Sequence, residues 1–320
     1  MPMRMLCCAR WLLLASLCLA SGISAAETPL RVAKAQAYAY AFLPLDLGIE
    51  LGLFKKHGVE VSPSQLDGSG KMHQAMASDS IDIALGAGSD MVFVAKGSPE
   101  LAVAALAGPP LELILAVRPD APIKTAADLK GRVIGVSAVA SLTGWMVREL
   151  SRRQGWAPED IKVFSASVPA RWAAMSAKEI DGTVVDLGSG LVAERKGSAR
   201  ILLHFGDLVK DFQIHAIYAT NKLIAAHPEA VRGFLAGWFE TIAFMRANKD
   251  KTVRMAQKMT GFDVDILARS YDEVMPELSD DGKFDRKALA VISRSFVELN
   301  LLDKEPDMTK LYTEAYLPKN

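Results

Sequence analysis

An alternation of strand-like and helix-like segments constrains the fold more than any other feature of the sequence. In its clearest instance, residues 81–85 alternate between apolar and smaller or polar side chains, which is the period of a strand. Gly86-Ala87-Gly88 then permits a sharp turn, and Ser89 and Asp90 are good N-cap residues for the apolar run that follows. Such a turn aims free backbone N–H groups past the sheet edge. We therefore expect one wall of a small-molecule site here.

The same series occurs twice along the chain and is followed by a helical tail. Strand, loop and helix repeat from Leu30, a polar connection lies around residues 117–119, and a second series extends to about residue 210. One more strand-like run covers residues 214–220, and only helical periodicity follows from Pro228. This pattern predicts an α/β protein with mostly parallel sheets flanked by helices and a helical C-terminal extension.

Residues 1–26 have the pattern of a secretory signal peptide. Arg4 and Arg10 precede or flank a short apolar core, and Ser24-Ala25-Ala26 supplies the small residues that a signal peptidase reads. We expect export with cleavage after about Ala26. A retained anchor is the alternative. Lipidation at Cys18 is disfavoured because the bulky Leu17 precedes it.

All three cysteines, Cys7, Cys8 and Cys18, lie in this N-terminal segment. The mature chain would therefore offer no disulfide, thiol nucleophile or cysteine-bound metal. The full sequence has 37 basic and 37 acidic residues, and loss of the two arginines leaves 35 against 37. A slightly acidic protein argues against nucleic acid or an anionic membrane as its partner.

Familiar catalytic and cofactor motifs are incomplete. Gly68-Ser69-Gly70-Lys71 resembles a phosphate loop, but Gln65 stands at the first glycine position and Met72 replaces the hydroxyl residue. Met91 occupies the last glycine position of a dinucleotide fingerprint, and Gly188-Ser189-Gly190 lacks the spacing of a nucleophile elbow. The five histidines show no metal-ligand spacing. We expect no cofactor, no bound metal and no enzymatic activity.

Four phrases together resemble a known family. They are residues 50–61 (ELGLFKKHGVEV), 75–84 (AMASDSIDIA), 123–136 (IKTAADLKGRVIGV) and 177–182 (AKEIDG). The combination resembles the periplasmic solute-binding proteins of ABC importers, in the group that binds nitrate, sulfonates and taurine, with relatives that bind thiamine pyrimidine precursors. The resemblance covers about residues 30–220.

The resemblance implies a type II, clamp-like periplasmic-binding-protein fold. Lobe one would comprise residues 27–115 and 215–320, with the C-terminal helices, and lobe two residues 116–214. Two crossing strands would form the hinge, and a solute in the cleft would favour the closed state because it touches both lobes only there.

The implied function is an extracytoplasmic receptor in the periplasm. It would be a monomer that delivers a sulfonate, taurine, nitrate-like or carboxylate solute to ABC permease subunits, which have a separate ATPase. A binder or synthase of a thiamine pyrimidine precursor on the same fold is the alternative. A third possibility is a ligand sensor that docks on a sensor kinase.

Candidate ligand-binding residues lie in the loops that follow the parallel strands, where open α/β sheets bind ligands. Helix N-termini converging there would favour an anionic head group. Ordinary tight turns and helix caps are the alternative explanation of these residues. They are Ser69, Gly70, Gly86, Gly88, Ser89, Ser137, Ser141 and Thr143.

Aromatic residues offer a second set of candidates. Tyr38, Tyr40 and Phe42 form either an aromatic wall of the site or part of the core. Trp145, one turn into a helix of the second series, caps the ligand or belongs to the buried stripe of its helix.

Two charged residues complete the candidates and would favour solutes of opposite charge. Arg171, near a helix start, could clamp a carboxylate or sulfonate, or lie on the surface as a solvated arginine. Asp186 ends a strand, and if it faces the cleft unpaired it would favour a cationic or amine-bearing solute and oppose a bare anion.

Overall fold

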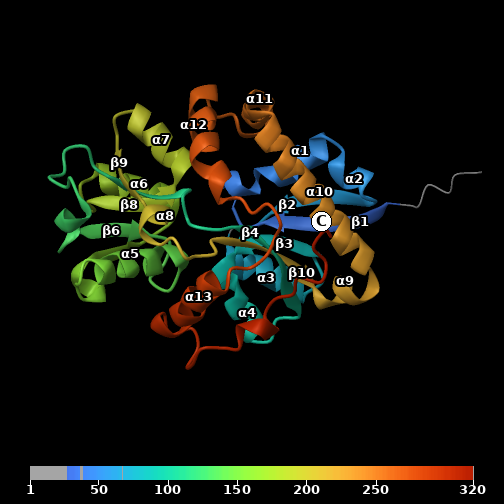
Figure 1. Ribbon diagram of the computed structural model, residues 1–320. Helices are drawn as coiled ribbons and strands as arrows, with labels where there is room; N and C mark the ends of the chain where they lie inside the picture. Colours follow the sequence, from blue (N-terminus) through green and yellow to red (C-terminus); the bar gives the residue numbers. More distant parts are fainter. Residues whose placement is uncertain (1–26, 37–38, 67, 320) are drawn as a thin grey trace, which may run out of the picture.

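Two five-stranded sheets form the centres of two lobes, which lie side by side in Figure 1. The computed structural model describes residues 27–36, 39–66 and 68–319. The first-lobe sheet has the order β2-β1-β3-β10-β4, and the second-lobe sheet has the order β7-β6-β8-β5-β9. The strands are β1 (Thr28–Lys34), β2 (Val59–Gln65), β3 (Ile83–Ala87), β4 (Glu100–Ala107), β5 (Leu113–Val117), β6 (Val133–Val136), β7 (Lys162–Ser165), β8 (Gly182–Asp186), β9 (Arg200–His204) and β10 (His215–Thr220).

One strand in each sheet opposes the direction of the others. In the first lobe β1 is parallel to β2 and β3, whereas β10 is antiparallel to β3 and β4. In the second lobe β6 is parallel to β7 and β8, whereas β5 is antiparallel to β8 and β9. Both reversed strands follow the segments that cross between the lobes. The sheets are thus mostly parallel, as the alternating pattern predicted.

The strands next to the crossings are buried along most of their length. All six residues of β10 are buried, as are the first four of β3, and the register pairs Ile217 with Leu85. Helices cover both faces of such a sheet, so its central strands become continuously apolar. The carboxyl end of β3 and the amino end of β10 consequently meet at the inter-lobe edge.

The lobes are joined by two short segments, residues 108–112 and 209–214. They are hydrogen bonded to each other, because Ile214 donates its backbone N–H to the Gly108 carbonyl at 3.0 Å. Gly108 in turn donates to the carbonyl of Glu277, at 2.8 Å, which brings the C-terminal extension to the same place. β5 already begins at Leu113, and the predicted boundaries at residues 115 and 215 remain a proposal.

Helices enclose both sheets. The first lobe carries α1, α2, α3 and α4, and the second carries α5, α6, α7 and α8. Their bounds are α1 (Leu43–Glu50), α2 (Leu53–Lys56), α3 (Ser69–Ala77), α4 (Met91–Ala95), α5 (Leu142–Arg153), α6 (Val168–Ser176), α7 (Leu187–Arg195) and α8 (Phe205–Leu208). The tail forms α9 (Asn221–Ala226), α10 (Pro228–Ala247), α11 (Lys249–Thr260), α12 (Val264–Val274) and α13 (Arg286–Glu298).

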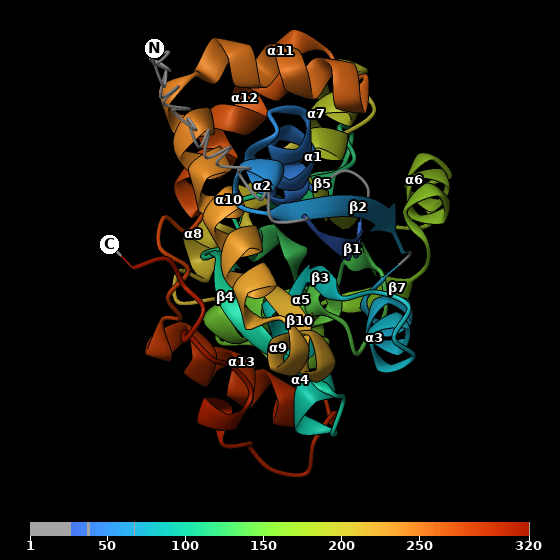
Figure 2. The same ribbon diagram turned by 90° about the vertical axis from the view of Figure 1, so that its right-hand side faces the viewer.

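The C-terminal extension touches both lobes, whereas the sequence predicted that it packs on one. α10 lies along α1 and α2, and α12 lies against α7 of the second lobe, as Figures 1 and 2 show. Arg269 of α12 forms an ion pair with Glu194 of α7 at 3.0 Å. At the other side of the molecule, Trp145 of α5 donates a hydrogen bond to Glu298 of α13.

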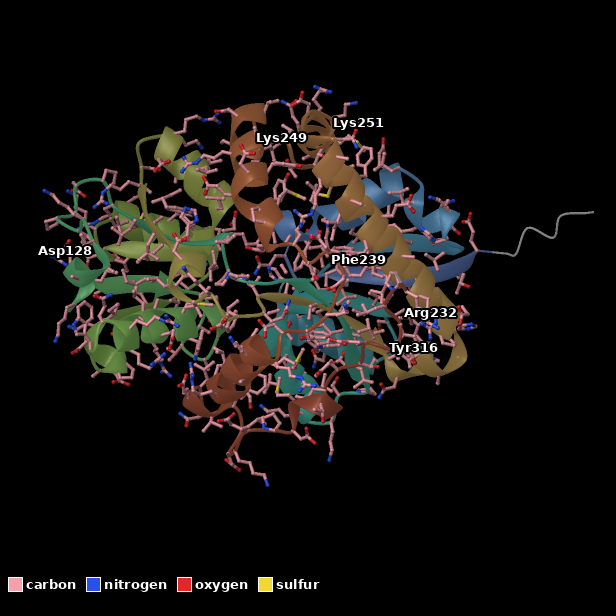
Figure 3. The ribbon with its side chains drawn as sticks, in the orientation of Figure 1. Asp128, Arg232, Phe239, Lys249, Lys251 and Tyr316 are labelled. Atoms are coloured by element: carbon pink, nitrogen blue, oxygen red, sulfur yellow. The ribbon has the colours of Figure 1, made fainter. Side chains whose placement is uncertain are left out.

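The end of the chain returns to α10. The Arg232 guanidinium lies 5.1 Å from the centre of the Tyr316 ring and donates a hydrogen bond to the Ala315 carbonyl, and both labelled side chains are close together in Figure 3. Within the described part of the chain, no helix combines the length and apolarity that a membrane crossing requires.

Candidate functional site

A cavity of about 460 Å³ lies where the loops of the two lobes face each other. Its first-lobe wall comes from the loop after β1, the start of α3, the turn after β3, and α4. Its second-lobe wall comes from the β6–α5 loop and the end of β8, and the crossing segments add residues from both hinge strands. This volume is typical of a site that encloses a small organic molecule.

Many of the predicted site residues line this cavity. The structure brings together side chains from segments more than 100 residues apart in the sequence. Their role in ligand binding stays a prediction. They are Phe42, Ser69, Ser89, Ser137, Ser141, Thr143 and Asp186.

The N-termini of α3 and α5 lie at the cavity, one in each lobe. α3 starts at Ser69 after Gly68, whose φ of 91° is favourable only for glycine, and no side chain caps this end. α5 starts after Ser141, whose hydroxyl accepts a hydrogen bond from the Gly144 N–H at 3.3 Å. Helix N-termini carry unpaired N–H groups and partial positive charge, so both ends can attract an anionic group.

Three hydroxyls form a connected cluster on the second-lobe wall. Ser137 Oγ lies 2.9 Å from both Ser141 Oγ and Thr143 Oγ1, and the Ser137 N–H donates to Thr143 Oγ1 at 3.0 Å. Ser141 Oγ also donates to the Ala138 carbonyl at 2.7 Å. Since hydroxyls donate and accept, this wall can adjust to either kind of polar group on a solute.

Glu112 and His215 add titratable side chains to the cavity wall, and sequence reasoning missed both of them. Both side chains are buried and line the cavity, and Glu112 Oε1 lies 2.5 Å from His215 Nε2. The other carboxylate oxygen of Glu112 accepts a hydrogen bond from the Ala41 N–H at 3.2 Å. Glu112 follows Pro109-Pro110 just before β5, which marks it as a residue of the crossing. Nothing in the local sequence indicates its histidine partner.

Asp186 faces the same space but is not unpaired. It caps α7, accepting hydrogen bonds from the Ser189 N–H at 2.8 Å and the Ser189 hydroxyl at 2.7 Å. Burial raises the pKa of Asp186, the two Ser189 bonds act in the opposite direction, and the charge of Glu112 raises it further. The net direction is upward, so burial favours the protonated form of the Asp186 carboxyl.

Asp90 connects the cavity to a buried histidine. Its carboxylate accepts a hydrogen bond from the Ala87 N–H at 2.9 Å and lies 3.2 Å from His73 Nε2. His73 Nδ1 lies 2.7 Å from Glu100 Oε1. Burial alone would lower the pKa of His73, but its bonds to Asp90 and Glu100 outweigh burial and raise that pKa to about 9. Asp90 and Glu100 thus connect His73 of α3 to the start of α4 and to β4.

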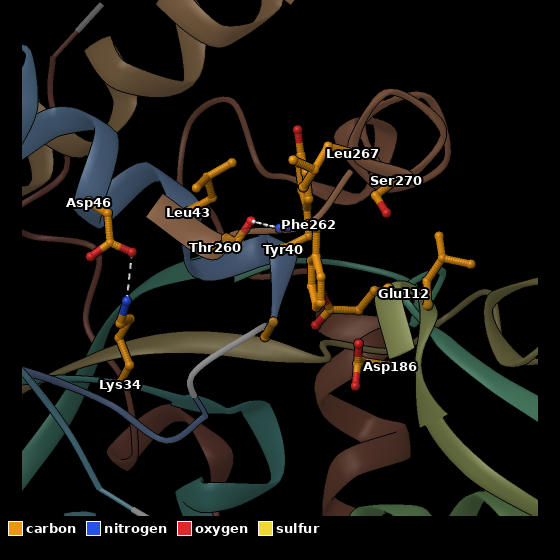
Figure 4. A pocket seen from close by; sticks show the side chains of 13 residues that line it. Lys34, Tyr40, Leu43, Asp46, Glu112, Asp186, Thr260, Phe262, Leu267 and Ser270 are labelled. Atoms are coloured by element: carbon orange, nitrogen blue, oxygen red, sulfur yellow. Dashed lines mark hydrogen bonds and ion pairs between the residues drawn. The ribbon is translucent and has the colours of Figure 1, made fainter. Parts of the chain in front are cut away.

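Tyr40 lines a smaller adjoining pocket of about 30 Å³, which Figure 4 shows. Glu112 and Asp186 line both spaces, so the small pocket continues the cavity. Burial raises the pKa of Tyr40, whose buried hydroxyl has no hydrogen-bond partner among the described residues. In this pocket Lys34 forms an ion pair with Asp46 at 2.6 Å. Tyr38 lies outside the described residues.

Three predicted glycines are absent from the described cavity lining. Gly70 has open space around its Cα. A Cβ on Gly86 would lie 2.6 Å from Asp90 Oδ2, and one on Gly88 would lie 2.0 Å from the Gln213 carbonyl oxygen. Gly88 therefore permits close packing of the turn on the crossing segment, and Gly86 leaves room for the side chains of Asp90 and Met72.

Trp145 and Arg171 also lie away from the described lining. Trp145 is 1% exposed, stacks on Phe212 with ring centres 5.2 Å apart, and belongs to the core. Arg171 is 3% exposed, so it is not a solvated surface arginine, and its role as a clamp stays a prediction. Its guanidinium donates to the Val184 carbonyl and to Thr183 Oγ1, and burial lowers its pKa against the opposing effect of Asp186.

Comparison with known proteins places this geometry in a class. The alkanesulfonate-binding protein SsuA from Xanthomonas axonopodis pv. citri, bound to MOPS, superposes with a TM-score of 0.76 at 16% identity, over 91% of this chain and 99% of that chain. The periplasmic nitrate-binding protein NrtA from Synechocystis PCC 6803 superposes with a TM-score of 0.68 at 15% identity, over 91% and 87%. Two lobes around a cavity define a periplasmic-binding-protein fold.

A family model described as NMT1/THI5 like matches residues 40–252, more than half of the sequence. The chain belongs to the NMT1/THI5-like family. A protein of Escherichia coli (strain K12) named for binding aliphatic sulfonates is 27% identical over 191 residues. That alignment covers 59% of this chain and 56% of the relative, so the chain spans little more than half the length of that relative.

Proposed function

We propose that this protein is the periplasmic receptor of an ABC importer and that it binds a small organic solute with an anionic head group, a sulfonate or a carboxylate. The observation that carries the proposal is the pairing of two helix N-termini at one cavity. The start of α3 comes from the first lobe and the start of α5 from the second. An anion that accepts N–H and hydroxyl hydrogens from both walls stabilises the closed arrangement.

The named ligands of the relatives support this choice of solute class. The compared proteins are described as binding alkanesulfonates, aliphatic sulfonates and nitrate. The hydroxyl cluster of Ser137, Ser141 and Thr143 supplies additional donors next to the α5 terminus. The receptor would work as a monomer, deliver the solute to permease subunits with a separate ATPase, and catalyse no reaction.

A second candidate, a receptor for an aminopyrimidine of the thiamine-precursor type, is favoured by one observation. Glu112 and Asp186 place carboxyl groups in the cavity lining. These groups do not favour a solute that is purely anionic. Carboxyl oxygens accept hydrogens from amino groups, so a solute with both an anion and an amine, such as taurine, also fits this combination.

The test is a binding panel on the purified protein. Methanesulfonate, taurine, nitrate, acetate and an aminopyrimidine are each added at increasing concentration, and thermal unfolding is followed. A ligand at about a hundred times its Kd stabilises the folded state by about 2.7 kcal/mol, which raises the Tm by several degrees. A response to sulfonates or carboxylates supports the proposal, and a response only to the pyrimidine transfers it to the second candidate.

Two variants locate the binding. Ser137→Ala removes a cavity hydroxyl and should weaken binding of the responding anion about tenfold, because one charge-assisted hydrogen bond is lost. Ser176→Ala removes an exposed hydroxyl that binds only the Trp172 carbonyl at 3.0 Å, away from the cavity, and should leave affinity unchanged. Equal affinity of both variants, or no response to any anion, contradicts the anion site.

A further inference from the structure

Three buried residues from separate segments of the chain converge at the hinge. Glu112 comes from the first crossing segment, His215 begins β10 after the second, and Glu277 lies in the C-terminal extension just beyond α12. Each is at most 5% exposed, and one ligand atom from each lies within 4.8 Å of the others.

The second polar atom of each side chain is held by the backbone. Glu112 Oε2 accepts the Ala41 N–H, Glu277 Oε2 accepts the Glu112 N–H at 3.0 Å, and His215 Nδ1 lies 3.3 Å from the Gly86 carbonyl. Glu112 Oε1 and His215 Nε2 face each other at 2.5 Å, and Glu277 Oε1 lies beside them without a hydrogen-bond partner among the described residues. A shared ion would replace the direct Glu112–His215 contact. Metal-binding histidines and carboxylates are oriented in this way by contacts of their other atoms.

Glu277 supplies an independent indication that a partner belongs here. Its Oε1 is buried without a hydrogen-bond partner among the described residues, and the ion pairs found there include none of Glu277. Two carboxyl groups are buried together beside one histidine, and charges buried in this way are costly unless a proton or a cation neutralises them.

We propose that Glu112, His215 and Glu277 bind one divalent transition-metal ion. Two carboxylate oxygens and an imidazole nitrogen form a ligand set that suits zinc and neighbouring metals. Because Glu112 and His215 also line the cavity, the ion would lie beside the space where the solute is proposed to bind. A cation there would attract an anionic solute to the acidic end of the cavity, a consequence that rests on the proposed function.

A second buried Glu–His cluster shows why convergence matters. His73 directs its two ring nitrogens to two different carboxylates, with Nδ1 near Glu100 and Nε2 near Asp90. Among the described residues these side chains do not gather three ligand atoms at one point, so this cluster forms two separate ion contacts. It provides a matched control because Glu100 is buried to the same degree as Glu277.

The experiment measures metal uptake without any solute, so its outcome is independent of the proposed function. The full chain is freed of metal with a chelator and titrated with Zn²⁺ by calorimetry, and with Co²⁺ by visible absorption. We expect one site per chain and a Co²⁺ ligand-field spectrum that Zn²⁺ abolishes. Absence of uptake by folded wild-type protein overturns the proposal and leaves a shared proton as the neutralising partner.

Variants then assign the site. Glu277→Gln keeps the shape of the side chain and should weaken Zn²⁺ binding at least tenfold, whereas Glu100→Gln should bind as wild type does. If Glu277→Gln does not fold, His215→Gln with circular dichroism as a folding check replaces it, and the Co²⁺ band should lose its intensity. Zn²⁺ affinity equal to wild type in a folded variant of the cluster overturns the assignment.

Discussion

Trp145 of the second lobe donates its indole N–H to Glu298 of the C-terminal extension, with 2.8 Å between Nε1 and Oε2. The indole also stacks on Phe212 of a crossing segment. One buried side chain thereby connects α5, the hinge and α13. Through this contact the C-terminal extension is held to the second lobe as well as to the first.

Removal of this bond should destabilise the protein measurably. Trp145→Phe and Glu298→Ala each lose the bond, and a double-mutant cycle should give a coupling free energy of about 1–2 kcal/mol, since the acceptor is charged. The measurement is equilibrium unfolding in urea for the wild type and three variants. Trp156→Phe serves as the control, because that ring is half-buried at the edge of the core, with Lys130 Nζ 5.6 Å from its centre. A coupling near zero would show that the contact contributes nothing to stability.

Replacement of Arg171 should affect folding, in contrast to its predicted role as a ligand clamp. Arg171→Met keeps the volume but loses the bonds to the Val184 carbonyl and Thr183 Oγ1, and should lower the free energy of unfolding by about 2–4 kcal/mol. The thermal midpoint of the apo protein measures this loss. Arg254→Met on the exposed face of α11 should change stability by less than about 0.5 kcal/mol. An unchanged midpoint in Arg171→Met contradicts the structural role.

The two-lobed architecture was predictable because it depends on local patterns that recur along the chain. Strand periodicity and glycine turns each act over a few residues, and they predicted a strand and a turn at residues 81–88, where β3 lies. The loops after parallel strands lie at one edge by topology alone, which is why Ser69, Ser137 and Asp186 line one cavity.

The missed features depend on contacts that no local pattern encodes. Glu112, His215 and Glu277 are isolated in sequence and meet only because the two crossing segments and the C-terminal extension come together. Trp145 and Arg171 occupy positions whose exposure depends on the orientation of α5 and α6 against the sheet. From the sequence, Gly88 could serve either to present a backbone N–H to a ligand or to leave room for a neighbouring segment. Only its short distance to Gln213 shows that it leaves room.

Gly88→Ala should therefore disturb the hinge. Its Cβ would lie 2.0 Å from the Gln213 backbone oxygen, so the turn or the crossing segment has to move, and we expect a loss of about 2 kcal/mol or more. Gly70→Ala is the matched control: it has open space in the first turn of α3 and should be neutral or stabilise by up to about 1 kcal/mol. Both are compared by urea unfolding. Equal stability of the two variants would mean that the turn relaxes freely.

The buried His73 should make stability depend on pH. Its folded pKa of about 9 exceeds the ordinary value of 6.5, because the contacts with Asp90 and Glu100 outweigh burial. The folded state thus retains a proton that the unfolded state releases. The stabilisation is complete below about pH 6.5 and is lost as the pH rises toward 9, amounting to about 3 kcal/mol.

Urea unfolding between pH 6 and pH 9 measures how stability changes with pH. The profile of His73→Gln should be flatter than that of the wild type, whereas the profile of His227→Gln, at an exposed histidine, should match it. Parallel profiles for wild type and His73→Gln would show that His73 binds no additional proton in the folded state.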